Sequence, residues 1–147
     1  MQITDVLETH VHADYISGAR EIKHRTGGQA QIHCSGLGGK EWTPPYADHV
    51  VQDGDAVMLG SLRLQALHTP GHTPEHIVWL AFDETRSKDT PWLVFTGDFL
   101  FVGDVGRPDL LGDRFPPFLG RVEDWIDVED DASKRVDPMA HDLTELE

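Results

Sequence analysis

Histidines and carboxylates gather in three short segments of this 147-residue chain, each at the end of an apolar run. The first segment is residues 10–14 (HVHAD), the second ends on His72 and the third on Asp98. Imidazole and carboxylate groups bind divalent metals when rigid elements hold them together and leave one side open. The three segments together predict a catalytic metal site with His10, His72 and Asp98 as ligands, a facial triad with positions left for substrate, water or dioxygen.

Other polar residues near these segments are expected to support the site. His12 and Asp14 would orient the ligands or a bound water, or be the remnant of a second metal site. Asp14 is also a good N-cap for the helix that follows it. His76 begins a strand and either lines the cavity or only starts that strand. His68, before a Thr-Pro-Gly turn, is expected to support the metal ligands or to be structural.

The elements that must position these residues are mostly short strands. Apolar and alternating runs predict strands over 3–7, 30–34, 57–59, 62–67, 77–82 and 92–95. One helix is expected over 15–25, with Gly27-Gly28 as its stop signal, and a second near 118–126. Residues 35–55 read as a loop, and Gly60-Ser61 as a hairpin turn. This order predicts mixed α and β structure, α/β (α+β), with largely antiparallel pairing.

The charge of the chain limits the partners it can have. Its net charge of −14 argues against nucleic acid or an anionic membrane, because phosphate would be repelled. Ten acidic residues but only two basic ones lie between residue 123 and the end. The segment 116–147 is therefore expected to be an acidic, solvated tail, helical or disordered.

The single cysteine, Cys34, excludes an intrachain disulfide and a thiolate-rich zinc cluster. It is expected to be a half-buried thiol in a strand. The apolar runs are too short to span a bilayer, and the first residues lack the features of a signal peptide. A cytoplasmic protein is the resulting expectation.

Four motifs resemble the metallo-β-lactamase fold superfamily: residues 8–18 (ETHVHADYISG), 68–75 (HTPGHTPE), 95–98 (FTGD) and 106–109 (GRPD). Within it they are most similar to the persulfide (sulfur) dioxygenases, the ETHE1-like group, which includes members fused to rhodanese domains. The resemblance covers about residues 3–111. It implies an αββα sandwich, incomplete at the N-terminus and atypical at the C-terminus, with 1–115 as a partial domain before the acidic segment.

The resemblance also implies a function. A mononuclear iron(II), held by His10, His72 and Asp98, would oxidise a persulfide of glutathione or a similar thiol with O2 to sulfite. Arg107 would bind the anionic substrate, and Tyr15 would donate a hydrogen bond into the site. Tyr15 stands where the hydrolytic members, such as hydroxyacylglutathione hydrolase, carry a histidine for a second metal. A phenol is a poor zinc ligand at neutral pH, which favours one metal.

Two other functions stay open at this point. One is a zinc-dependent hydrolase acting on a thioester, with Asp14 as the base for a metal-bound water. The other is an inactive, truncated fragment of such an enzyme. A small-molecule persulfide or thioester, a rhodanese domain or protein, and a second copy of the chain are the candidate partners.

Overall fold

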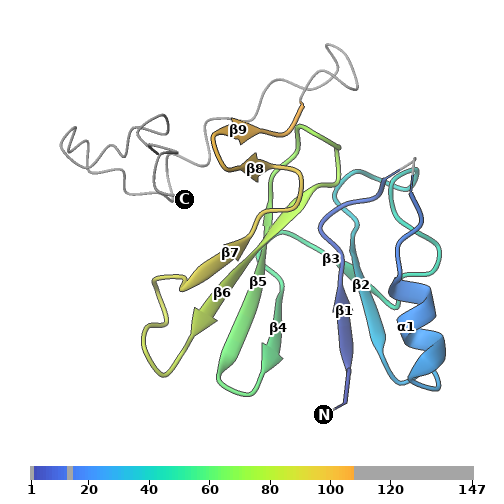
Figure 1. Cartoon of the computed structure of the whole chain (residues 1–147), viewed down its shortest axis with the longest axis horizontal. Helices are drawn as coiled ribbons and strands as arrows, with labels where there is room; N and C mark the ends of the chain where they lie inside the picture. Colours follow the sequence, from blue (N-terminus) through green and yellow to red (C-terminus); the bar gives the residue numbers. More distant parts are fainter. Residues whose placement is uncertain (1, 13–14, 108–147) are drawn as a thin grey trace, which may run out of the picture. The chain divides into compact units, whose positions relative to one another are not determined.

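The computed structural model describes residues 2–12 and 15–107, which form short strands and one helix (Figure 1). In chain order the elements are β1 (Asp5–Leu7), α1 (Ala19–Arg25), β2 (Gln31–Ser35), β3 (His49–Val51), β4 (Ala56–Leu59), β5 (Leu62–His68), β6 (Ile77–Asp83), β7 (Leu93–Phe95), β8 (Leu100–Phe101) and β9 (Asp104–Val105). The expected mixture of helix and strand is confirmed. Asp14, the acidic segment 116–147 and its expected helix lie outside the described residues.

The strands form two main sheets. β1, β2 and β3 make a parallel three-stranded sheet, and β4, β5, β6 and β7 follow one another in an antiparallel four-stranded sheet. β8 and β9 form a separate antiparallel pair. The expectation of largely antiparallel pairing is confirmed, because four of the six strand pairs in the described residues are antiparallel and the two pairs of the first sheet are parallel. Parallel neighbours need a crossover connection, and α1 provides it between β1 and β2 (Figure 1).

β3 corrects the prediction of a continuous loop over residues 35–55. Its three residues pair in parallel with β2, which places His33 opposite His49. A strand of three residues shows no readable alternation, so only its long-range partner reveals it.

The helix α1 is shorter than predicted. It begins at Ala19 rather than at Tyr15, with Gly18 at the N-cap position, and the Oγ of Ser17 accepts the N–H of Ala19 at 3.0 Å. Ala19 packs against Ile32 and Cys34 of β2. The thiol of Cys34 is fully rather than half buried, and this burial raises its pKa to about 12.

β6 is the centre of the hydrophobic core. Its residues 77–82 are all buried, because alternate side chains enter different clusters on the two faces of the sheet. Trp79 packs with Val51 of β3, which joins the two sheets. The indole N–H of Trp79 also donates to the carbonyl of Glu8 at 3.2 Å. The core therefore fixes the end of β1, from which the chain enters the first histidine segment.

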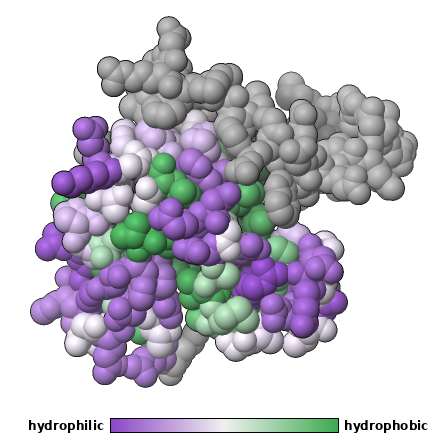
Figure 2. Space-filling model, turned by 180° about the vertical axis from the view of Figure 1, so that it is seen from behind, coloured by the Kyte–Doolittle hydropathy of each residue, from purple (hydrophilic) through white to green (hydrophobic). Residues whose placement is uncertain are grey.

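Apolar side chains stay exposed toward the end of the described chain. Residues of β7, β8 and β9 and their connections are more than a third exposed: Trp92, Leu93, Val94, Phe95, Leu100, Phe101, Val102 and Val105. The view from behind likewise shows hydrophobic patches between hydrophilic surfaces (Figure 2). Among the described residues, no helix has the length and hydrophobicity needed to cross a membrane.

Candidate metal centre

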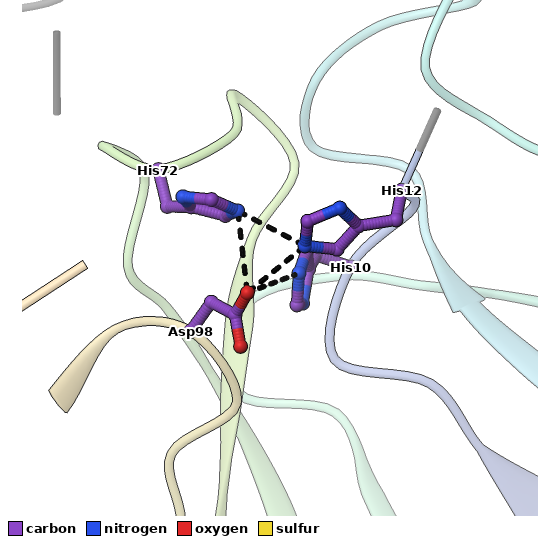
Figure 3. A group of neighbouring side chains, drawn as sticks. All are labelled: His10, His12, His72 and Asp98. Carbon is purple, nitrogen blue, oxygen red and sulfur yellow. Dashed lines mark hydrogen bonds and ion pairs between the residues drawn. The ribbon is translucent and has the colours of Figure 1, made fainter. Parts of the chain in front are cut away.

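Loops at the ends of three strands bring His10, His12, His72 and Asp98 together (Figure 3). The two histidines of the first segment follow β1, His72 follows β5, and Asp98 follows β7. Each side chain offers one possible ligand atom, and the four atoms lie within 4.8 Å of one another. Asp98 Oδ2 lies 2.9 Å from His12 Nε2, 3.5 Å from His72 Nε2 and 3.7 Å from His10 Nε2. The three segments singled out in the sequence therefore meet at one point.

The chemistry of this group fits a divalent cation. The Nε2 atom of His10 is buried and has no hydrogen-bond partner, and the Nε2 atoms of His12 and His72 lie only 3.2 Å apart. His10 Nδ1 is 2.9 Å from Thr9 Oγ1, and the tautomer with its proton on Nδ1 leaves the Nε2 lone pair facing the group. Nitrogen lone pairs and a carboxylate that face one another repel unless a proton or a cation lies between them. The Nε2 proton of His12 does this toward Asp98, and a divalent cation would do it for His10 and His72.

The protonation states agree with this. Burial lowers the pKa of His10 to about 4, so the imidazole is neutral at pH 7. Burial alone would raise the pKa of Asp98, but the hydrogen bond from His12 and the nearby His10 and His72 outweigh it and lower the pKa. Metal binding requires a neutral imidazole and an ionised carboxylate, and His10 and Asp98 are in these states at neutral pH.

Access to the group is one-sided. The side chains of His10 and His72 are only 3% and 8% exposed, whereas that of Asp98 is 38% exposed. The side chain of His12 is 20% exposed, so a ligand or substrate can approach from the side of His12 and Asp98.

Comparison with known proteins identifies the family. Residues 1–138 match the metallo-beta-lactamase superfamily. The chain belongs to this superfamily. A hydroxyacylglutathione hydrolase of Methylobacterium sp. (strain 4-46) is 38% identical over 122 residues, which are 80% of this chain and 44% of that protein.

Two crystal structures show the same fold. A metallo-beta-lactamase from Staphylococcus aureus subsp. aureus COL has a TM-score of 0.63 at 44% identity, over 76% of this chain and 33% of that one. ETHE1 from Myxococcus xanthus has a TM-score of 0.58 at 38% identity, over 74% of this chain and 41% of that one. The strand-rich structure agrees with the superfamily's α/β sandwich, and the chain spans less than half the length of these three relatives.

Two further histidines, His68 and His76, flank the loop that carries His72. His76 is fully buried directly before β6, with Nδ1 2.9 Å from Thr69 Oγ1 and its ring 4.7 Å from that of His10. It therefore packs behind His10 and does more than start a strand. His68 Nε2 lies 2.9 Å from the carbonyl of Pro74, which ties together the two ends of the loop that carries His72.

Tyr15 and Arg107 lie at the edges of the site. The ring of Tyr15 is more than half exposed and lies 4.7 Å from the ring of His12. Arg107 is exposed and follows Gly106, whose N–H donates to the carbonyl of Phe99 at 3.0 Å. A Cβ on Gly106 would be 1.7 Å from the carbonyl oxygen of Asp98, so the chain before Arg107 runs directly against the site.

Glu75 is a site residue that the sequence did not single out for a role. It is 1% exposed, and its Oε1 accepts the N–H of Val11 at 2.8 Å. Val11 lies between His10 and His12, so this carboxylate fixes the loop that carries both. Burial raises the pKa of Glu75, and the Val11 N–H partly offsets the shift. One signal in the sequence could have indicated that Glu75 is buried. It stands directly before a histidine and a strand that is wholly apolar.

The buried histidines predict a pH-dependent stability. Burial lowers the pKa of His10 to about 4 and that of His76 to about 3, from 6.5. As pH falls below 6.5, the unfolded chain takes up protons that the folded chain does not, so the free energy of unfolding falls. The slope is up to about 1.4 kcal/mol per pH unit for each histidine, and stability levels off above about pH 7.

Urea unfolding of the metal-free protein between pH 4.5 and 7.5 measures this slope. His76→Gln cannot take up the proton, so its slope is expected to be shallower than that of the wild type. Equal slopes for the two proteins would contradict the burial of a neutral His76.

Proposed function

We propose that His10, His72 and Asp98 bind one iron(II) ion and that this centre oxidises a thiol persulfide, such as glutathione persulfide, with O2 to sulfite. The observation that carries the proposal is the convergence of the three ligand atoms on one point with an accessible side at Asp98. Two imidazoles and one carboxylate with open positions are typical of iron(II) oxygenases. The motif resemblance to persulfide dioxygenases and the likeness to ETHE1 also support it.

In this proposal the surrounding residues position the reactants. His12 donates its Nε2–H to Asp98 Oδ2 at 2.9 Å and orients the carboxylate. Arg107 would bind the anionic persulfide or sulfite, and Tyr15 would donate its O–H to an oxygen atom in the site. A bound iron(II) would activate O2 for transfer to the terminal sulfur. One persulfide, one O2 and one water then give one thiol, one sulfite and two protons.

The position of His12 supports one metal rather than two. Its Nε2 faces Asp98 and His72 within the same group, and Tyr15 packs on its ring. Among the described residues, His10, His12, His72 and Asp98 form the one group of three or more potential metal ligands whose atoms lie within 4.8 Å of one another.

A second candidate is a zinc-dependent hydrolase acting on a thioester. The presence of a third imidazole, that of His12, in the group favours it, because three histidines suit catalytic zinc. The 38% identity to a hydroxyacylglutathione hydrolase favours it as well. The metal would then lower the pKa of a bound water.

Metal content and substrate turnover separate the two functions. Protein purified without oxygen is expected to contain about one iron per chain and to consume O2 when glutathione persulfide is added, with sulfite as the product. Zinc in the protein together with thioester hydrolysis and no O2 uptake would favour the hydrolase. Neither activity with either metal would overturn both.

Metal is also expected to stabilise the fold. A ligand that binds only the folded state adds about 2.7 kcal/mol to the free energy of unfolding at one hundred times its dissociation constant. Thermal unfolding with iron(II) or zinc should therefore show a raised midpoint. Magnesium, which prefers oxygen ligands, serves as the control and is expected to leave the midpoint unchanged. No cooperative transition, or equal midpoints with all metals, would support the inactive-fragment alternative.

A further inference from the structure

A cavity of about 480 Å³ lies next to the loop that carries His10 and His12. Val11, between these two histidines, forms part of its wall. The rest is mostly aromatic and proline side chains, with one acid: Trp42, Pro44, Pro45, Tyr46 and Glu41. This cavity suits an uncharged organic group beside the metal centre, and Glu41 disfavours an anion there.

A second cavity, of about 470 Å³, shares Tyr46 as a wall and runs along α1. Its lining is basic, with Arg20, Lys23 and His24. That is unusual in a chain of net charge −14, which has only 12 lysines and arginines. Tyr46 itself packs against the cluster that anchors α1 on β2, so the wall between the cavities is held in place.

Arg20 is the cation on α1 that is available to a ligand. Lys23 pairs with Asp48, and Arg25 pairs with Glu21 at 2.7 Å on the exposed side of the helix. The guanidinium of Arg20 lies 5.9 Å from the centre of the Tyr46 ring. Within residues 2–12 and 15–107, no carboxylate forms an ion pair with it.

We infer that the two cavities bind the thiol carrier of the substrate, with its uncharged part against Trp42 and Tyr46 and an anionic end on Arg20. The charges of the two cavities determine which way the carrier lies. Glu41 disfavours the anionic end of the carrier in the first cavity, and the basic residues of the second cavity attract that end at α1. The ligand is thus an organic thiol derivative that ends in a carboxylate or a phosphate. The inference rests on the proposed function, because that function supplies the sulfur that reacts at the metal. Binding of the carrier can nevertheless be measured without any reaction.

Calorimetric titration of the metal-free protein with unreactive thiols tests this. The probes are glutathione, which carries carboxylates, coenzyme A, which carries phosphates, and the neutral N-acetylcysteamine. Arg20→Gln is expected to weaken binding of the preferred anionic thiol about tenfold and to leave the neutral thiol unchanged. Arg25→Gln removes the same charge from the same helix outside the cavity, and it is expected to leave all binding unchanged.

Two further variants make the outcome decisive. Trp42→Leu acts on the uncharged part, so it is expected to weaken neutral and anionic thiols alike. Arg20→Lys keeps the charge and is expected to restore most of the binding lost in Arg20→Gln. Equal losses for Arg20→Gln and Arg25→Gln, or no anionic thiol bound more tightly than the neutral one, would overturn the inference. Because no metal or turnover is involved, failure of the proposed oxidation leaves this result readable.

Discussion

Replacing His72 by alanine is expected to remove the bound metal and to lower persulfide-dependent O2 uptake by more than about a hundredfold. His72 Nε2 lies 3.5 Å from Asp98 Oδ2 in a side chain that is only 8% exposed. No other described side chain reaches the group from the loop after β5. The alanine variant would keep His10 and Asp98 as ligands, because in the proposed centre His12 donates its Nε2–H to Asp98 instead of binding the metal. Two ligands are too few to hold a metal that must also bind substrate.

His49→Ala is the control for this variant. His49 is an exposed histidine of β3 that stacks on His33, with ring centroids 4.6 Å apart, and it is not part of the group of four. Iron content and O2 uptake of this protein should equal those of the wild type. Equal uptake by the wild type and His72→Ala would defeat the assignment of the site.

The sequence predicted the parts of the site that are local. Strand ends before His10, His72 and Asp98 follow from short apolar runs, and the structure brings these three side chains together. The hairpin at Gly60-Ser61 was equally readable, because glycine supplies the positive φ, here +64°, that its turn uses. In each case neighbours along the chain determine the conformation.

Features that depend on distant residues could not be read in the same way. β3 exists through its pairing with β2, and α1 begins at Ala19 because that residue packs on β2. His12 could not be placed inside the group, since its orientation depends on Asp98, 86 positions away. The same holds for Glu75, whose partner is the N–H of Val11, 64 positions away.

Two hydrogen bonds between residues far apart in the sequence connect the hydrophobic core to the metal centre. Trp79 holds the carbonyl of Glu8, and the carbonyl of Thr9 accepts the N–H of Ile77 at 2.9 Å. Both bonds attach the segment before His10 to β6, the most buried strand. A change that moves Thr9 should therefore affect stability and metal binding together, and Gly97 lies at that point.

Gly97→Ala is expected to lower the free energy of unfolding by roughly 2–5 kcal/mol and to weaken metal binding. Gly97 has φ +53°, which costs an alanine about 1–2 kcal/mol. A Cβ there would also lie 2.6 Å from Thr9 Oγ1 and 2.9 Å from His76 Nε2, and overpacking costs about 1–3 kcal/mol more. Thr9 Oγ1 contacts His10 Nδ1, so its displacement turns the ring that faces the metal.

Gly60→Ala isolates the backbone part of this effect. Gly60 has φ +64°, close to that of Gly97, but no atom lies within 4 Å of its added Cβ. It should cost only about 1–2 kcal/mol in urea unfolding and leave metal affinity unchanged. Equal costs for the two variants would mean that Gly97 does not approach Thr9. The chain after β7 must pass against Thr9 and His76 to bring Asp98 to the histidines, and only a glycine fits there. We therefore expect a larger loss of stability for Gly97→Ala than for Gly60→Ala, together with weaker metal binding.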